Sequence, residues 1–146
     1  MAYQDDIKKA AALLLPWNKL SGCNILVTGA TGLIGGCLVD VLMAHKGRNY
    51  NVYASGRNEE RAGRRFLKYA DDNAFHFVKY DVAQPLEYDV NFQYIIHAAS
   101  GAYPEEFIKH PVEVIKGNIN GLDNLMGYGI QHGIKRLLYI SSDMLH

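Results

Sequence analysis

The stretch that decides the fold is "NILVTGATGLIGGCLVDVLMA", residues 24–44. It begins with a short apolar run, continues through Gly29, Gly32 and Gly35 at intervals of three residues, and ends in a longer apolar segment. A short apolar run closed by glycine predicts a buried strand, and the longer segment predicts a helix. The glycines therefore lie at a strand-to-helix turn, which is the context in which such a pattern predicts phosphate binding.

Each feature of this turn suits a dinucleotide. Glycine tolerates the backbone angles of a tight turn and lets the pyrophosphate approach the backbone closely. The first residues of the helix offer free N–H groups and the positive end of the helix dipole. We therefore expect residues 29–35 to bind the phosphates of a dinucleotide, although glycine-rich turns with a purely structural role also exist.

Predicted strands and helices alternate along the rest of the chain. The predicted strands are residues 24–29, 51–56, 75–81, 92–100 and 136–142. The predicted helices are residues 4–15, 32–45, 58–70 and 111–133. Short strands that are apolar on both faces and alternate with helices are typical of βαβ units. The sequence thus predicts an α/β fold: a Rossmann-type doubly wound parallel sheet of about five strands, order 3-2-1-4-5, in three α/β/α layers.

The chain divides into two regions on this interpretation. Residues 1–22 are expected to form a helix and a linker, and residues 23–146 the dinucleotide-binding domain. Two of the predicted helices carry an apolar face. In the long helix it consists of Ile115, Ile119, Leu122, Met126 and Ile130. In the helix after the glycine loop it consists of Leu33, Cys37, Val41 and Ala44.

Composition argues against several classes of protein. Apolar residues make up 49% of the 146 residues and the formal net charge is zero, so nothing indicates a nucleic-acid or membrane partner. The six histidines have no metal-ligand spacing, and no metal site is expected. Two cysteines do not make a disulfide framework, and the N-terminus lacks the pattern of a signal peptide. We expect a cytoplasmic location.

Five motifs together resemble the extended short-chain dehydrogenase/reductase family, which includes NAD-dependent epimerases and dehydratases that act on nucleotide sugars. They follow one another in the order of the family and leave out only the N-terminal helix. The motifs are "TGATGLIG" (28–35), "KYDV" (79–82), "HAAS" (97–100), "GNINGLDNLM" (117–126) and "YISS" (139–142).

The resemblance implies roles for residues in these motifs. Ser142 would be the catalytic hydroxyl, and Asn118 would support the active site and the cofactor. The other implied cofactor-binding residues lie in the glycine loop and after the third and fourth strands: Gly29, Thr31, Gly32, Leu33, Ile34, Gly35, Asp81, Val82, Ala98, Ala99 and Ser100. Each single match also has a structural explanation, such as a loop cap for Asp81, so the order of the motifs carries the interpretation.

The end of the second strand bears on the choice of cofactor. NAD-specific sites usually place an acidic residue there, about 20 residues after the glycine loop. This chain reads "YASGRNEER" over residues 53–61, with no acidic residue at the strand end. A guanidinium and a hydroxyl suit a 2′-phosphate. We therefore expect Ser55, Arg57 and Asn58 to bind the adenosine ribose and NADP to be preferred over NAD. A solvated Arg57, or one stacked on the adenine, is the alternative.

The chemistry of the family implies one further motif, Tyr-x-x-x-Lys, as the acid/base pair. None of the ten tyrosines of this chain has a lysine four residues on. We therefore expect a truncated chain: the dinucleotide-binding portion of an NAD(P)-dependent epimerase, dehydratase or reductase that acts on a nucleotide sugar. The chain alone is expected to bind dinucleotide without turnover.

Two other functions stay open at this point. One is a non-catalytic NAD(P)-binding or sensor protein, against which Ser142 argues because a sensor has no need of that hydroxyl. The other is an atypical NADP-dependent reductase. The sequence does not identify the substrate. The family further implies a homodimer through the helix of residues 111–132, and the apolar edge of residues 137–142 is an alternative surface for self-association.

Overall fold

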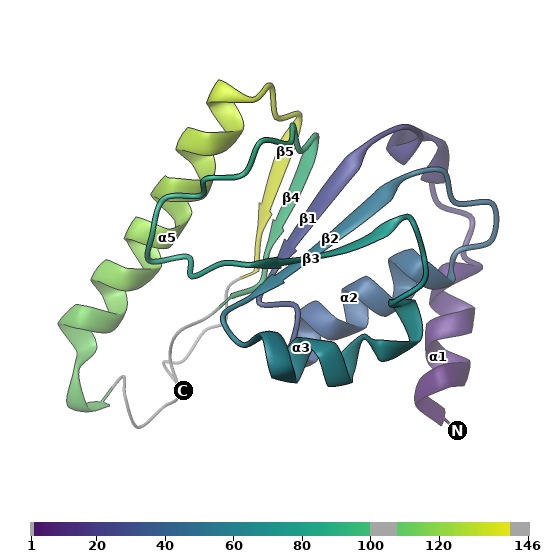
Figure 1. Ribbon diagram of the computed structural model, residues 1–146, viewed down its shortest axis with the longest axis horizontal. Helices are drawn as coiled ribbons and strands as arrows, with labels where there is room; N and C mark the ends of the chain where they lie inside the picture. The colour runs from purple at the N-terminus through teal and green to yellow at the C-terminus, as the bar shows by residue number, and fades with distance from the viewer. Residues whose placement is uncertain (1, 100–107, 141–146) are drawn as a thin grey trace.

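A computed structural model describes residues 2–99 and 108–140. Its centre is a five-stranded sheet in the order β3-β2-β1-β4-β5, and every neighbouring pair of strands is parallel (Figure 1). The strands are β1 (Asn24–Thr28), β2 (Asn51–Gly56), β3 (Phe75–Lys79), β4 (Tyr94–His97) and β5 (Arg136–Tyr139). The predicted Rossmann-type sheet and its strand order are confirmed.

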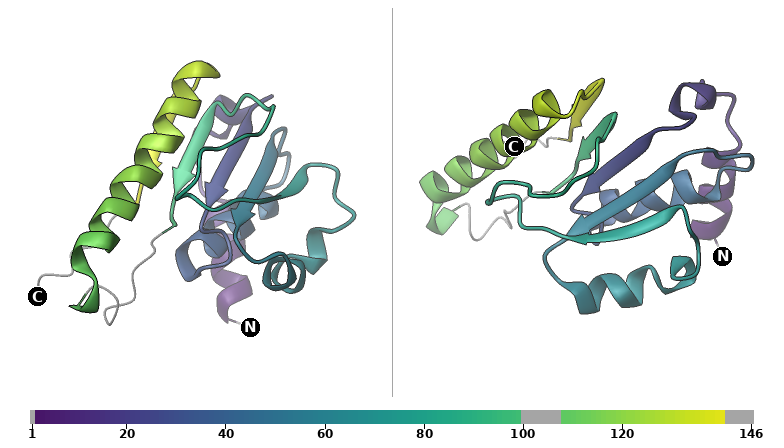
Figure 2. Two further views of the ribbon diagram at one scale, coloured as in Figure 1. Left: turned by 60° about the vertical axis from the view of Figure 1, so that its left-hand side comes forward. Right: turned by 45° about the horizontal axis from the view of Figure 1, so that its top comes forward.

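Helices cover both faces of the sheet. The α-helices are α1 (Ala2–Ala11), α2 (Leu33–Ala44), α3 (Glu59–Arg65) and α5 (Pro111–Gln131), and two short 3-10 helices are η1 (Trp17–Leu20) and η2 (Leu67–Tyr69). Helix α5 lies on one face of the sheet, whereas α2 and α3 lie on the other (Figures 1 and 2). The predicted three layers are therefore present.

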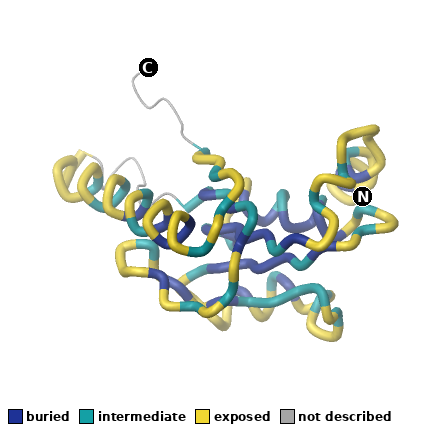
Figure 3. Tube along the Cα trace, turned by 90° about the horizontal axis from the view of Figure 1, so that it is seen from above, coloured by how far each residue is buried: buried dark blue, intermediate teal, exposed yellow. Residues whose placement is uncertain are grey.

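The central strand β1 joins the two halves of the core. Ile25 and Val27 pack in a cluster with side chains of α2, and Leu26 packs with Leu125 of α5 on the opposite face. All four of these side chains are at most 1% exposed. Figure 3 shows how the buried residues concentrate in the central strands. Successive side chains of β1 are thus buried on opposite faces of the sheet, which holds the strand in place. The glycine loop begins where β1 ends.

Helix α1 is shorter than predicted. It ends at Ala11 rather than near residue 15, and Leu13–Leu15 are 53–103% exposed. Pro16 explains part of the difference, because a proline disfavours helical angles in the residue before it. Helix α1 packs against α2 and buries Ile7 and Ala11.

A second contact holds the N-terminal segment to the end of α2. The ring of Trp17 stacks on His45, with 4.0 Å between the ring centroids. His45 Nδ1 also lies 2.8 Å from the carbonyl oxygen of Ala11. The segment before β1 is thus held against the domain at both ends.

Other predicted boundaries also shift. Strand β4 spans residues 94–97 instead of 92–100, and β5 ends at Tyr139. The predicted helix of residues 58–70 consists of α3 followed by η2. Residues 141 and 142 of the last predicted strand lie outside the described residues.

The predicted apolar faces of the two longest helices do not face the sheet. On α5, the buried residues are Gly121, Leu125, Tyr128 and Gly129. Four residues of the predicted stripe are instead 47–74% exposed: Ile115, Ile119, Met126 and Ile130. On α2, the buried residues are Gly35, Gly36, Val39, Asp40, Leu42 and Met43, while Leu33 is 89% exposed.

No helix within residues 2–99 and 108–140 is long and apolar enough to cross a membrane. The cytoplasmic location stays a prediction.

Candidate functional site

A cleft of about 800 Å³ opens at the carboxyl ends of the strands. Its wall consists of the glycine loop, the residues that follow β2, β3 and β4, and the first half of α5. This edge is where parallel α/β sheets bind their ligands. The volume lies in the range of small-molecule sites, so a ligand larger than a phosphate ion can fit.

The glycine loop forms the floor of this cleft by close backbone contacts. Gly29 has a φ of 63°, and a Cβ there would lie 2.6 Å from the Cα of Ala99. A Cβ on Gly35 would lie 2.2 Å from the carbonyl oxygen of Gly29. Both distances exclude a side chain, so the two glycines let β1, the loop and the residues after β4 approach one another. The result is an open backbone surface at the start of α2.

The end of β2 supplies the polar groups at one end of the cleft. Ser55 is 1% exposed, lines the cleft, and its Oγ has no hydrogen-bond partner among the described residues. Arg57 and Arg61 line the same region, and Arg61 Nη2 donates to the carbonyl oxygen of Thr31 at 3.3 Å. A buried hydroxyl without a partner and two guanidiniums in one cleft fit a ligand that offers oxygen atoms.

Asn58, expected to bind the adenosine ribose, has its side chain at the start of α3. Its side chain caps α3, and its Oδ1 accepts a hydrogen bond from the backbone N–H of Arg61 at 3.0 Å. Asn58 is not among the residues that line the cleft. It therefore fixes the start of the helix that carries Arg61.

The loop after β3 contributes to the wall of the cleft. Asp81 and Val82 both line it. Asp81 Oδ1 also accepts a hydrogen bond from the backbone N–H of Ala83 at 3.0 Å, so it caps its own loop. Asn124 Nδ2 donates to the carbonyl oxygen of Val82 at 3.1 Å and ties this loop to α5. Asn118, two turns nearer the start of α5, lines the cleft.

A buried polar pair holds the residues after β4. Thr28 Oγ1 and His97 Nδ1 lie 2.6 Å apart, and the backbone N–H of Ala99 donates to Thr28 Oγ1 at 3.3 Å. Burial lowers the pKa of His97, which favours a neutral imidazole. The pair thus positions Ala98 and Ala99 at the cleft without placing a charge there.

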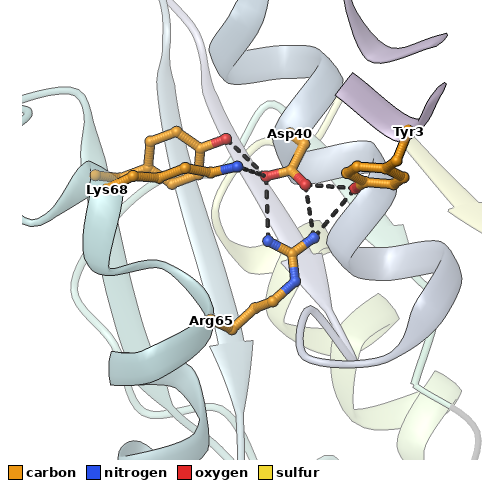
Figure 4. Close-up of polar contacts among 5 residues, drawn as sticks. Tyr3, Asp40, Arg65 and Lys68 are labelled. Carbon is orange, nitrogen blue, oxygen red and sulfur yellow. Dashed lines mark hydrogen bonds and ion pairs between the residues drawn. The ribbon is translucent and has the colours of Figure 1, made fainter. Parts of the chain in front are cut away.

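A buried carboxylate, that of Asp40, is surrounded by polar side chains from α1, α3 and η2 (Figure 4). Asp40 of α2 is 1% exposed and pairs with Arg65 of α3, with 2.6 Å between Oδ2 and Nη2. The hydroxyls of Tyr3 and Tyr69 also donate to it, and Lys68 Nζ lies 3.4 Å away. Burial by itself would raise the pKa of Asp40, but the hydrogen bonds from Arg65, Tyr3 and Tyr69 outweigh it and lower the pKa to about 2. Burial and the hydrogen bond to the Asp40 carboxylate raise the pKa of Tyr3 to about 12.

Comparison with known proteins assigns the family. The model of the NAD dependent epimerase/dehydratase family matches residues 25–145. The chain belongs to this family. UDP-glucuronic acid decarboxylase 2 of Arabidopsis thaliana is 30% identical over 128 residues, which are 86% of this chain and 27% of that protein. The chain spans about a quarter to a third of the length of such curated relatives.

Solved structures share the fold. A UDP-glucose-4-epimerase from Stenotrophomonas maltophila, with bound NAD and formylated UDP-arabinopyranose, has a TM-score of 0.66 and 23% identity and is matched over 84% of this chain and 38% of its own. A yeast methylglyoxal/isovaleraldehyde reductase complexed with NADPH has a TM-score of 0.61 and 18% identity, over 82% of this chain and 37% of its own.

The cleft of this epimerase/dehydratase family member brings together most residues that the motifs and the end of the second strand suggested. They are Gly29, Thr31, Gly32, Leu33, Ile34, Gly35, Ser55, Arg57, Asp81, Val82, Ala98, Ala99 and Asn118. Ser100 and Ser142 lie outside the described residues.

Sequence reasoning missed several residues of the cleft wall. They are Gly56, Arg61, Tyr80, Ala83, His110, Glu113, Val114 and Gly117. Helical spacing could have found two of them, since Val114 and Gly117 lie within one or two turns before Asn118 on α5. Within the described residues, no three His, Cys, Asp or Glu side chains gather in a way that could hold a metal ion.

Proposed function

We propose that the cleft binds a nicotinamide dinucleotide and prefers NADP over NAD. The observation that carries the first part is the close packing of Gly29 and Gly35, which leaves bare backbone N–H groups at the start of α2 for the pyrophosphate. The preference for NADP rests on the end of β2, where Ser55, Arg57 and Arg61 line the cleft. Guanidinium groups pair well with phosphate oxygens.

Titration with NADPH and NADH tests both parts of this proposal. We expect both to bind, with NADPH tighter, and we expect Arg57→Ala to reduce that difference about tenfold, because it removes a charged hydrogen bond to the phosphate. Binding of neither cofactor would contradict the assignment of the cleft. Equal binding of both cofactors, unchanged in Arg57→Ala, would contradict the NADP preference alone.

We also propose that the whole protein is an NAD(P)-dependent enzyme that acts on a nucleotide sugar. The support is the family, together with relatives described as a UDP-glucuronic acid decarboxylase and a UDP-glucose-4-epimerase. The nicotinamide ring, when bound, supplies hydride transfer. Asn118 in the cleft wall would help to hold the cofactor, and Ser142 would donate a hydrogen bond to the substrate oxygen.

Activity assays on UDP-sugars and dTDP-sugars separate this enzyme from a non-catalytic NAD(P)-binding protein or an atypical reductase. We expect no turnover by these 146 residues, since none of the ten tyrosines is followed by a lysine at the fourth position. For the whole protein we expect turnover that falls strongly in Ser142→Ala. A whole protein that binds cofactor but converts no sugar nucleotide would favour the sensor, and NADPH oxidation with small aldehydes would favour the reductase.

Self-association belongs to the same proposal. The exposed side chains of Ile115, Ile119, Met126 and Ile130 line up along α5, at intervals that suit a helical interface. In β5, Leu138 and Tyr139 are 57% and 37% exposed. Sedimentation at increasing protein concentration should show a dimer, whereas a strictly monomeric protein would contradict this part.

A further inference from the structure

Helix α3 carries one arginine of the cleft wall, Arg61, but buries little of its own surface. It has only seven residues, and Ala62 is the one that is buried. Phe66, directly after the helix, is buried in the core and holds that end of it. Asn58 caps the other end of α3, and between the two ends only the small side chain of Ala62 packs inward. The polar contacts of the arginines therefore add to what fixes the direction in which the exposed side chains of α3 point.

Arg61 and Arg65 lie one helical turn apart and so project from the same side of α3. Arg61 reaches the glycine loop through the carbonyl oxygen of Thr31. Arg65 reaches Asp40 with both terminal nitrogens, at 3.3 Å to Oδ1 and 2.6 Å to Oδ2. The second contact is much the stronger, because it is a bidentate ion pair to a carboxylate that is only 1% exposed.

Helix α2 is shaped to admit this guanidinium. A Cβ on Gly36 would lie 2.9 Å from Nη2 of Arg65 and 3.1 Å from the carbonyl oxygen of Ala30. Because Gly36 has no side chain, the guanidinium of Arg65 can pass close to α2 and reach Asp40. Figure 4 shows the guanidinium directed at the carboxylate, with Tyr3 of α1 completing the cluster.

We propose that Asp40 is a positioning residue for cofactor selection. By fixing Arg65 it sets the rotation of α3, and this rotation holds Arg61 beside the glycine loop, where a 2′-phosphate of the bound cofactor would lie. Asp40 touches no ligand itself. The inference rests on the proposed preference for NADP and adds a residue behind the cleft that maintains it.

The test compares two fragments of the cofactor, 2′,5′-ADP and 5′-AMP, which differ by the 2′-phosphate. The ratio of their affinities reports phosphate recognition, whereas a general loss of structure weakens both. We expect Arg61→Ala to reduce the ratio about tenfold, as for a lost charged hydrogen bond, and Asp40→Asn to reduce it about threefold or more. Arg65→Lys, which keeps the charge but not the bidentate geometry, should act in the same direction.

Tyr69→Phe is the matched control. It removes one hydrogen bond from the same carboxylate but leaves the contacts of Arg65 in place. We expect it to lower the melting temperature without changing the ratio. A fall of the ratio in Tyr69→Phe equal to that in Asp40→Asn would show a merely structural role and overturn the proposal.

The double variant Asp40→Asn/Arg61→Ala tests whether Asp40 affects phosphate recognition through Arg61. If Asp40 acts through Arg61, the double variant should have the ratio of Arg61→Ala alone. An additional loss in the double variant, or an unchanged ratio in both Asp40→Asn and Arg65→Lys, would refute the inference. A ratio near one in the parent protein would instead contradict the NADP preference, so the two failures are distinguishable.

Discussion

The two halves of the sheet differ in how firmly they are packed. In the half that carries the glycine loop, the four inner residues of β2, residues 52–55, are all buried. In the half next to α5, strand β5 has no buried residue, and α5 exposes large apolar side chains such as Ile119 and Ile130. Both halves contribute to one cleft.

The difference in packing indicates which half of the molecule contributes more to the affinity for a ligand. Groups that must hold a ligand in a fixed geometry work best on rigid elements. The glycine loop, Ser55 and the cluster around Asp40 all lie in the firmly packed half. The first half of α5, which lines the cleft, has no buried residue before Gly121. We therefore expect the adenosine and pyrophosphate end to dominate cofactor affinity.

Glycine substitutions should show the largest contrast between the halves. Gly35→Ala places a methyl group 2.2 Å from the carbonyl oxygen of Gly29, so we expect cofactor affinity to fall more than about a hundredfold, with a loss of stability. Gly117 also lines the cleft, on α5, but a Cβ there meets nothing within 4 Å. Gly117→Ala should stabilise the helix by about 0.5–1 kcal/mol. Calorimetric titration measures the cofactor affinity of the two variants, and thermal unfolding measures their stability. Equal effects of Gly35→Ala and Gly117→Ala would contradict the difference between the two halves.

Leucine truncations compare the packing directly. Leu26 of β1 is 0% exposed, whereas Leu138 of β5 is 57% exposed. We expect Leu26→Ala to lower the free energy of unfolding by about 2–5 kcal/mol, since it leaves a cavity in the core. Leu138→Ala should cost less than about 1 kcal/mol. Denaturant unfolding of the two variants measures these losses. Similar losses of unfolding free energy would mean that β5 is as firmly packed as β1.

Acid unfolding should reveal the ion pair of the firmly packed half. The pKa of Asp40 is lowered from 3.8 to about 2, so the charged form is favoured by folding. Its contribution of about 2 kcal/mol is complete above pH 4 and is lost as the pH falls from about 4 to 2. Asp40→Asn should therefore be less stable than the parent at pH 7, and the gap should close toward pH 2. Parallel stability curves for the two proteins over this range would count against the assignment.

The smallest effect on stability is expected on the outer side of α5. Ile119 is 62% exposed, so Ile119→Lys should change the free energy of unfolding by less than about 0.5 kcal/mol. If this side of the helix forms the proposed dimer, the same substitution should weaken self-association in sedimentation experiments. Lys116→Ala, at another exposed position of α5, is the control and should leave the dimer intact. A dimer that survives Ile119→Lys would exclude this face of the helix.

Local patterns predicted the sheet because its order follows from a small set of rules. Short apolar strands that alternate with helices allow few topologies, and the glycine loop marks the first strand. The same patterns located most of the cleft, since ligand-contacting residues follow directly after the strands. Arg61 was missed because its role depends on the rotation of α3, which the sequence of the loop does not reveal.

The buried faces of the helices were harder to predict. Asp40 would be assigned to the surface from its type alone. Its partners Arg65, Tyr69 and Tyr3 come from segments 25–37 residues away, so only the folded chain brings them together. On α5, Gly121 and Gly129 are buried beside Leu125 and Tyr128, while the isoleucines at positions 115, 119 and 130 are exposed. A pattern that ranks residues by apolarity selects the opposite side.

Trp17, whose ring stacks on His45, can serve as an intrinsic fluorescence probe. Trp17 is the only tryptophan of the chain, so its emission is not mixed with that of any other indole. The stacked pair joins the segment before β1 to the end of α2, the helix that begins at the glycine loop. Fluorescence from this one residue can therefore report on the detachment of the N-terminal segment from α2.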